Sequence, residues 1–404
     1  MGRIEEKFAR LGVDSAPGQE VRRRNGVQGL TGEALEGVRV DFSHGDVNAF
    51  APIPGSKELF DVGYAEGAAQ AYTEYRGRAC LREYLAGKLT EFSGAPVNAD
   101  SQIIITPGTQ GALFLAMGAN VTRGDKVAIV EPDYFANRKL VEFFEGEIVP
   151  VKMDYFGAEG ERAGLDLDGL EAAFRDGARL FLFSNPNNPT GVVYTRAEIE
   201  AIGALAARYH AKVICDELYS RQIFDGREYT HLRATGTMDE NDLLTITGPS
   251  KTESLSGFRL GAAYGSPAMI QRMEKLQAIV SLRAAGYCQT ALRNWFSEPE
   301  GWMAERVRAH QAIRDDIMAV LRGISGVRAR MTEGGSYLFP QLPPLKLGLQ
   351  DFIDALRVQA NVIVTPGTEF GPYSDSFRVN FSQDHAAAVA AMERVAAMIA
   401  RYRA

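Results

Sequence analysis

Short segments rich in β-branched and aromatic residues alternate with helical patterns over about residues 100–265 of this chain. Such alternation is typical of a mostly parallel sheet with helices on both faces, since each parallel strand needs a crossover connection to the next. The sequence therefore predicts an α/β fold. We expect strands at residues 102–106, 126–130, 147–151, 180–184, 212–215 and 243–247.

The pattern changes after about residue 290, where a smaller α+β domain is expected. Its predicted elements are a long polar helix at 298–322, strand-like residues 336–340 and 377–381, and a helix from residue 384 to the end. The first residues of the chain are expected to return to this domain. The predicted organisation is a large domain of residues 61–290 and a small domain of residues 1–60 and 291–404.

The composition favours small-molecule chemistry. A chain of 404 residues with 46% apolar and 24% charged residues is long enough for two domains with substantial cores. The net charge is −7 with Lys and Arg scattered, which indicates no surface for nucleic acid or a membrane. The N-terminus lacks a secretory signal and no apolar run is long enough to span a bilayer, so we expect a cytoplasmic protein. No disulfide framework or metal site is predicted, because no CxxC spacing occurs among Cys80, Cys215 and Cys288.

Several candidate site residues follow the predicted strands or end them. Open α/β sheets bind ligands in the crevice beyond the carboxyl ends of their strands. We therefore expect these residues to meet in space. They are Gly108, Tyr134, Asn185, Asn188, Asp216 and Lys251.

Lys251 lies among small and hydroxylated residues, with Ser250 before it and Arg259 eight positions later. These surroundings suit an amine that forms a Schiff base beside a phosphate. A lysine amine becomes nucleophilic when desolvation or a neighbouring cation lowers its pKa. Taken alone, the motif is also compatible with a surface lysine on a loop.

Three further segments carry polar groups suited to a ligand. Asp216 ends a buried strand pattern, where a carboxylate needs a cationic or hydrogen-bonding partner unless it caps a helix. Residues 108–110 stand between a strand and an apolar helix, so their backbone N–H groups and the helix dipole can hold a phosphate. Asn185 and Asn188 are either turn formers or ligand contacts.

These motifs together resemble the class I and II pyridoxal 5′-phosphate aminotransferases of fold type I. They are Thr-Pro-Gly-Thr-Gln-Gly-Ala at 106–112, Asn-Pro-Asn-Asn-Pro-Thr-Gly at 185–191, Cys-Asp-Glu-Leu-Tyr at 215–219 and the lysine segment at 248–259. The likeness runs from about Tyr72 to Ser382. It implies a large domain with a mostly parallel seven-stranded sheet flanked by helices, a smaller α+β domain, and a homodimer with shared active sites.

The resemblance implies a role for each candidate residue. Lys251 would hold pyridoxal 5′-phosphate as an internal aldimine and then move a proton between substrate and cofactor. Asp216 would keep the pyridine nitrogen protonated, while Tyr219 and Asn188 would bond to the ring 3′-oxygen. The other implied contacts are Gly108, Thr109, Gln110, Ser250 and Arg259 at the phosphate, Tyr134 stacked on the ring, and Tyr72 reaching the phosphate of the neighbouring subunit.

Arg378 matches the family's arginine for the substrate α-carboxylate, although an arginine on an edge strand can also be an ordinary surface residue. Asn188 and Gly45 are also implied at the substrate, with Gly45 in a loop that closes over it. Two departures stand out. Gly248 replaces a serine found in many members, and Asp-Val-Asn at 46–48 replaces the usual Glu-Pro-Asp after the glycine.

The predicted function is a ping-pong exchange of the amino group between an L-amino acid and a 2-oxo acid. The alternatives are a pyridoxal phosphate β-lyase, decarboxylase, cyclising synthase or oxidase on the same scaffold, and a regulator, for which no basic DNA-binding module is present. The sequence does not identify the amino donor. Dicarboxylate-specific members place an arginine near the position of Ile279, and the cations that could replace it are Arg283, Arg138 and Lys139.

Overall fold

The protein is built around one central sheet of eight strands. The computed structural model describes residues 2–12, 29–45, 49–157 and 164–404. The strand order is β2-β9-β8-β7-β6-β3-β4-β5, and the strands from β4 through β3, β6 and β7 to β8 pair in parallel. The strands are β2 (Ile103–Pro107), β3 (Lys126–Glu131), β4 (Glu147–Asp154), β5 (Gly164–Leu165), β6 (Leu180–Ser184), β7 (Lys212–Asp216), β8 (Leu243–Thr247) and β9 (Leu260–Gly265).

All six strands expected from the sequence are present, and the sheet has eight strands where seven were predicted. The two strands without a sequence prediction are β5, a two-residue edge strand, and β9, which is antiparallel to both β2 and β8. Strand β9 could not be predicted from its sequence, because it consists mostly of glycine and alanine, which are weak strand formers. Its glycines are needed for close approach, because a Cβ on Gly261 would lie 2.5 Å from the backbone of Gly108.

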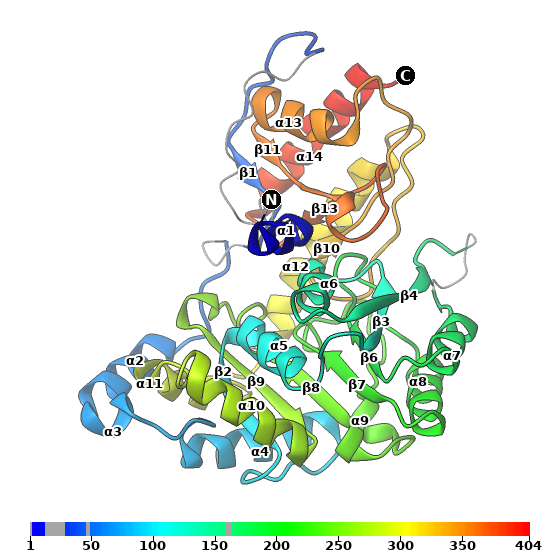
Figure 1. The fold of residues 1–404 in the computed structure, drawn as a ribbon. Helices are drawn as coiled ribbons and strands as arrows, with labels where there is room; N and C mark the ends of the chain where they lie inside the picture. Colours follow the sequence, from blue (N-terminus) through cyan, green and yellow to red (C-terminus); the bar gives the residue numbers. More distant parts are fainter. Residues whose placement is uncertain (1, 13–28, 46–48, 158–163) are drawn as a thin grey trace.

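Helices cover both faces of the sheet (Figure 1). Side chains along the central strands alternate between two cores. In β6, Phe181 and Phe183 pack into one core while Leu180 and Leu182 pack into the other. This period of two is the geometry of an extended strand. The helices around the sheet are α2 (Ser56–Ala65), α3 (Ala68–Ala71), α4 (Ala79–Ser93), α5 (Gly108–Gly118), α6 (Phe135–Phe143), α7 (Leu167–Arg175), α8 (Arg196–Arg208), α9 (Leu232–Thr235), α10 (Pro267–Val280), α11 (Gly286–Gln289), and the 3-10 turns η2 (Glu240–Asp242), η3 (Ser256–Phe258) and η4 (Thr290–Asn294).

The start of α8 illustrates how local sequence sets these boundaries. The Thr195 hydroxyl accepts a hydrogen bond from the Glu198 N–H, and the Glu198 carboxylate accepts one from the Thr195 N–H. This reciprocal capping box satisfies donors that a helix leaves free in its first turn. The helix begins where the sequence motif predicts it.

A smaller α+β region lies above the sheet in the view of Figure 1. Its core joins helices α12 and α14 to short strands, and Phe352, Phe377 and Tyr402 are fully buried in it. The elements are α12 (Trp302–Arg322), β10 (Tyr337–Leu338), α13 (Leu349–Gln359), β11 (Val362–Ile363), β12 (Thr365–Pro366), η5 (Gly367–Glu369), β13 (Phe377–Asn380) and α14 (His385–Tyr402).

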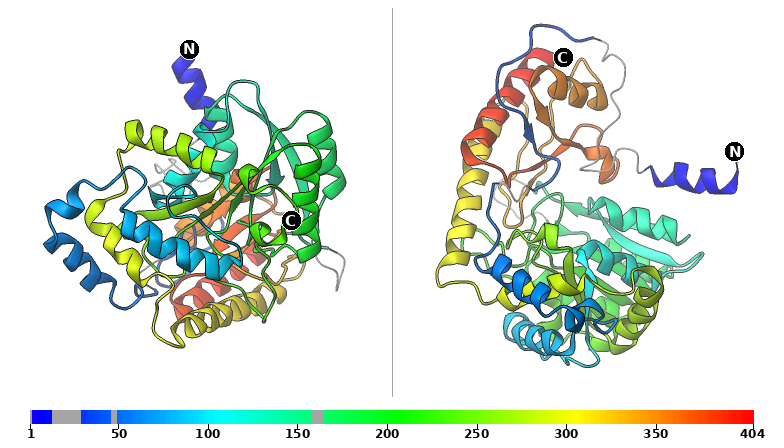
Figure 2. Two further views of the ribbon diagram at one scale, coloured as in Figure 1. Left: turned by 90° about the horizontal axis from the view of Figure 1, so that it is seen from below. Right: turned by 90° about the vertical axis from the view of Figure 1, so that its left-hand side faces the viewer.

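The N-terminal residues divide their contacts between the two regions. Strand β1 (Val40–Asp41) pairs in parallel with β11, which joins it to the smaller region. Helix α1 (Arg3–Leu11) lies instead beside α6, where Lys7 stands 4.1 Å from the centre of the Phe143 ring. Figure 2 shows α1 reaching away from the body of the molecule. The boundaries of the two predicted domains stay a prediction.

Candidate active site

Segments from distant parts of the chain meet at one pocket near the carboxyl ends of the parallel strands. Four of the residues named from the sequence, Gly45, Tyr219, Ser250 and Lys251, line it. Its other lining residues, which the sequence did not single out, are Ser254, Ser336, Asn380 and Ser382. Among the described residues no group of histidine, cysteine and acidic side chains could hold a metal ion.

Lys251 stands in the turn after β8 and is half-buried. Its carbonyl accepts a hydrogen bond from the Ser254 N–H at 3.0 Å, and the Leu255 N–H donates to Pro249 O at 3.0 Å. These bonds fix the turn that carries the lysine. Within the described part of the chain its ammonium group has no hydrogen bond or ion pair, so the amine is available to a ligand in the pocket.

Asp216 ends β7 and lies deep in the protein, with some of its side chain still accessible. Its carboxylate accepts a hydrogen bond from the Leu218 N–H at 3.0 Å, and no cation pairs with it among the residues the structure describes. Burial raises the pKa of this carboxyl to about 6. A buried carboxylate in this state favours a cationic ligand atom.

Arg378 is a buried guanidinium without an acidic partner among the described residues. It is 3% exposed, donates to Asn188 Oδ1 at 3.0 Å and to Ser43 O at 2.6 Å, and its Nε has no partner. Asn380 is fully buried as well, and its Nδ2 is unpartnered. Free buried donors of this kind are satisfied by a carboxylate ligand.

Two tyrosines, Tyr219 and Tyr337, lie beside this arginine. The hydroxyls of Tyr219 and Tyr337 lie 2.6 Å apart, and the Arg378 guanidinium stands 4.5 Å from the centre of the Tyr337 ring. Burial raises the pKa of Tyr219, so its hydroxyl stays protonated near neutral pH. Tyr337 was not found from the sequence because it lies in a two-residue strand without a motif of its own.

The turn from β2 into α5 forms the third side of the site. Gly108 has φ of +75°, and a Cβ at this position would lie 2.5 Å from Arg259 Nη2. Thr109 and Gln110 stand in the first turn of α5, whose free N–H groups suit a phosphate. The Tyr134 hydroxyl donates to Gln110 Oε1 at 3.0 Å, which brings its ring to the same turn. Ser250 lies near by, its hydroxyl 3.4 Å from Leu260 O.

The structure gives a reason for one departure from the family pattern. A Cβ on Gly248 would lie 2.8 Å from the methyl carbon of Thr109. In this chain the threonine side chain therefore occupies space that a larger residue at 248 would need. The replacement segment at 46–48 lies outside the described residues.

Tyr72 and Asn185 are two of the predicted residues that do not line the pocket of their own chain. Tyr72 is 80% exposed, and its ring lies under the guanidinium of Arg283 at 4.8 Å. Asn185 accepts a hydrogen bond from the Tyr194 N–H at 3.3 Å and thereby shapes the turn before Asn188. Its Nδ2 is buried without a hydrogen-bond partner among the described residues, so turn former and ligand contact both stay predictions for this residue.

Asp133 and Ser184 form a buried cluster behind the site that the sequence interpretation missed. Asp133 has no exposed surface, and its carboxylate accepts hydrogen bonds from the N–H and the hydroxyl of Ser184. The signal that drew attention to Asp216, a carboxylate at the end of a buried strand pattern, is also present here. Sequence reasoning used the segment Pro132-Asp133-Tyr134 only to place the ring of Tyr134, and so it gave the carboxylate of Asp133 no role.

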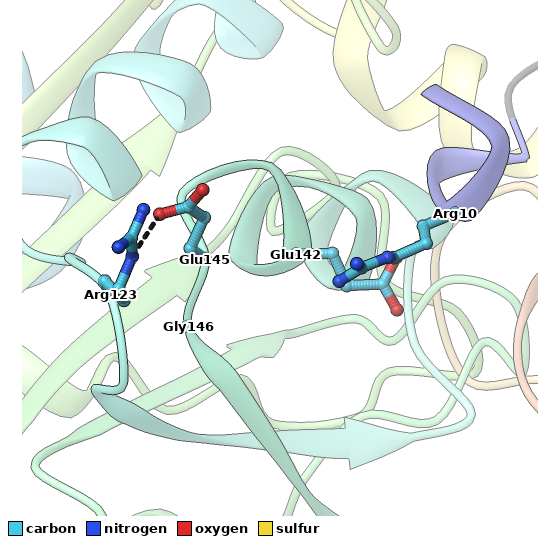
Figure 3. Close-up of a pocket in the computed structure, with 5 residues that line it drawn as sticks. All are labelled: Arg10, Arg123, Glu142, Glu145 and Gly146. Carbon is cyan, nitrogen blue, oxygen red and sulfur yellow. Dashed lines mark hydrogen bonds and ion pairs between the residues drawn. The ribbon is translucent and has the colours of Figure 1, made fainter. Parts of the chain in front are cut away.

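A second hollow lies on the outer surface between α1 and α6. Figure 3 shows its lining residues, where Arg123 pairs with Glu145 at 2.7 Å, and Arg10 and Glu142 also line it. Its charges are of both signs and neutralise one another. None of the residues predicted from the sequence belongs to it.

Comparison with known proteins identifies the family. Residues 48–395 match the model of the family described as aminotransferase class I and II. The chain belongs to this family. It is therefore an aminotransferase, an enzyme that moves the amino group of an amino acid to a 2-oxo acid.

Individual relatives agree with this assignment. A solved aspartate aminotransferase from Rhodobacter sphaeroides 2.4.1 is 61% identical, with a TM-score of 0.94 over 99% of this chain and 100% of that one. Aspartate aminotransferases from Sulfolobus acidocaldarius and Rhizobium meliloti are each 28% identical, covering 76% and 81% of this chain and the same shares of theirs. The predicted family, fold class and enzymatic activity are confirmed, and the other reactions of this scaffold are not favoured.

Proposed function

We propose that this aminotransferase works with pyridoxal 5′-phosphate bound to Lys251, takes aspartate as an amino donor, and acts as a homodimer. One observation carries the first part. Asp216 and Arg378 are charges of opposite sign without an ionic partner among the described residues. A protonated pyridine ring would neutralise the carboxylate, and the α-carboxylate of an amino acid would neutralise the guanidinium.

The residues present fit this cofactor at each of its ends. The first turn of α5, Ser250 and Arg259 would hold the phosphate, and the absence of a side chain at Gly108 lets the Arg259 guanidinium lie against this turn. Tyr134 would lie against the ring. Tyr219 and Asn188 would donate to the ring oxygen, as their buried hydroxyl and amide permit.

When bound, this cofactor supplies a ring that accepts electrons from the substrate Cα. Asp216 keeps a proton on the ring nitrogen, because an ionised carboxylate stabilises the adjacent cation. The Lys251 amine would hold the cofactor to the enzyme and, once the substrate amine has taken its place there, would take the proton from the substrate Cα. Arg378 and Asn188 hold the α-carboxylate, and Gly45 covers the bound substrate.

The choice of aspartate is supported by the relatives, of which the 61% identical structure is described as an aspartate aminotransferase. The side-chain carboxylate of aspartate needs a cation besides Arg378, which is proposed to bind the α-carboxylate. Arg138 and Lys139 are paired with Glu131 at 2.8 Å and Glu369 at 3.0 Å. Arg283 instead lies among exposed tyrosines and is our candidate for this contact.

A homodimer is supported by an exposed apolar surface that we call the tyrosine patch, since a monomer rarely exposes so many large apolar side chains together. The patch joins the end of α2, the residues after α3 and the end of α10, where Arg283 lies over two of its rings. Its members are Tyr64, Tyr72, Tyr75, Ile279, Val280 and Leu282. Both Tyr72 and Arg283 would then reach the site of the neighbouring subunit.

Two further expectations stay proposals. The division into domains of residues 61–290 and of residues 1–60 with 291–404 has not been tested. None of the described helices has the length and apolar character to cross a membrane, and a cytoplasmic location remains a prediction from the sequence.

The test is the absorption spectrum of the purified protein with pyridoxal 5′-phosphate, recorded before and after adding L-aspartate without a 2-oxo acid. We expect loss of the visible band of the bound cofactor and one equivalent of oxaloacetate per site. Lys251→Ala should abolish turnover while the protein still binds cofactor, and Lys152→Ala, an exposed lysine on β4, is the control. Release of ammonia or carbon dioxide with return of the band would contradict transamination, and normal turnover by Lys251→Ala would contradict the role of the lysine.

A further inference from the structure

Asp133 is a fully buried carboxylate surrounded by hydrogen-bond donors. It lies between β3 and α6 and has no cationic partner in the described part of the chain. Its oxygens accept from the Tyr134 N–H at 2.7 Å, the Ser184 N–H at 3.2 Å, the Ser184 hydroxyl and the Asn187 side-chain amide at 3.5 Å. Four donors around one carboxylate offset much of the cost of its burial.

The directions of these bonds are fixed by chemistry. Backbone N–H groups and the Asn187 NH₂ group can only donate. The Ser184 oxygen accepts from the Asn188 N–H at 3.1 Å and so gives its own proton to Asp133. Burial raises the pKa of Asp133 to about 7, and the donors around it act in the opposite direction. Each of its contacts suits an acceptor, and none suits a donor.

This cluster continues without interruption to the substrate-binding arginine. Ser184 bonds to Asn188, and Asn188 Oδ1 accepts from Arg378 Nη1 at 3.0 Å. Asn187 is held by the same carboxylate and by Pro132 O at 3.1 Å, and it accepts from the Thr190 hydroxyl at 2.6 Å. Hydrogen bonds to Ser184 before Asn188 and to Thr190 after it therefore hold the turn that carries Asn188.

We propose that Asp133 is a positioning residue for the substrate α-carboxylate: it orients Ser184 and Asn187, these place Asn188, and Asn188 holds the guanidinium of Arg378. Asp133 touches neither substrate nor cofactor and acts through these side chains. The inference rests on the proposed role of Arg378. It adds a residue that binds no ligand yet sets the affinity for both substrates, because amino acid and 2-oxo acid share the α-carboxylate.

The substitution Asp133→Asn tests this with almost no change of shape. One oxygen becomes an NH₂ group, which must face a donor whichever way the amide turns. We expect KM for L-aspartate and, in the reverse direction, for oxaloacetate to rise together by about tenfold, while kcat falls by less than about threefold. The cofactor spectrum and the affinity for pyridoxal 5′-phosphate should stay as in the wild type. Asp166→Asn, at the exposed N-cap of α7, alters a side chain that makes none of these hydrogen bonds and is the matched control.

A second variant keeps the test decisive if Asp133→Asn fails to fold. Ser184→Ala removes the one hydroxyl that links Asp133 to the Asn188 N–H and should give the same joint rise in both KM values. The double variant should resemble either single variant within about twofold, because both interrupt the same connection.

The outcomes separate this inference from the proposed function. Arg378→Lys is measured in parallel and should raise both KM values. If it does so while Asp133→Asn and Ser184→Ala leave them unchanged, or lower kcat alone, Asp133 is only a structural residue and the inference is wrong. If Arg378→Lys has no effect on either KM, the carboxylate assignment fails and the inference fails with it.

Discussion

Asp216 exemplifies how a single residue reveals what the site is built to bind. Its carboxylate has one backbone donor and no cation in the described structure, and its pKa is raised to about 6 by burial. Between about pH 4 and pH 6, the folded protein without cofactor therefore holds a proton that the unfolded chain, with an ordinary pKa of 3.8, has already released. Such a group lowers the free energy of unfolding, and a cationic ligand beside the carboxylate would offset this loss.

The raised pKa of Asp216 makes the stability of the cofactor-free protein depend on pH. Because the folded pKa is the higher one, the free energy of unfolding falls as pH rises from about 4 to about 6 and the penalty is constant above that. Asp216→Asn cannot titrate, so the cofactor-free variant should be more stable than wild type by about 2 kcal/mol above pH 6, allowing for partial exposure. The advantage should vanish near pH 4.

Urea unfolding of the cofactor-free proteins at several pH values measures this difference. Asp100→Asn, at a side chain that is 91% exposed, is the control and should change nothing. With pyridoxal 5′-phosphate bound, the order should reverse, since only the carboxylate can pair with the ring nitrogen. A stability difference that does not depend on pH would show that Asp216 does not carry this penalty.

At the scale of elements, the turn between β2 and α5 joins a backbone requirement to ligand binding. Gly108 combines a positive φ with close contact to Arg259. Gly108→Ala should cost about 1 kcal/mol of stability from the backbone alone, and its methyl group would displace the guanidinium. We expect affinity for pyridoxal 5′-phosphate to fall by about tenfold through the lost charge-assisted contact.

A matched control separates these two effects. Gly124 has φ of +80°, and no atom lies within 4 Å of the position that a Cβ would take there. Gly124→Ala should therefore lose similar stability and keep the wild-type affinity, measured by titration of the cofactor-free protein with pyridoxal 5′-phosphate. Equal affinity of both variants would contradict a role of the Gly108 turn in binding.

Some strands could be predicted from the sequence and others could not. Runs such as β6 and β8 were predicted with their observed bounds, because a strand buried on both faces is mostly apolar along its length. Strand β9 was not predicted, because its glycines and alanines allow close packing against neighbouring backbone but have a low propensity for strands. The candidate residues after the strands were found by motif, while Tyr337 and Asp133 were missed because their importance depends on tertiary partners.

For the whole molecule, the main structural argument for association is where Tyr72 and Arg283 point. Tyr72 belongs to the exposed tyrosine patch, Arg283 lies over its ring, and neither lines the pocket of its own chain. The sequence could suggest a shared site through the resemblance, but no pattern within one chain states which surface its partner covers. Burying this patch in a dimer would remove a large apolar area from water.

A charge placed in the patch should therefore separate the subunits. Ile279 is 81% exposed, and Ile279→Asp would bury an unpaired carboxylate if the patch is an interface. We expect sedimentation to change from dimer to monomer at micromolar concentration, with loss of most activity because Tyr72 and Arg283 no longer reach the neighbouring site. Val358→Asp, at a residue 58% exposed on α13, introduces the same charge outside the patch and should leave mass and activity unchanged. A dimer that persists with Ile279→Asp would place the interface elsewhere, and a fully active monomer would show that each subunit completes its own site.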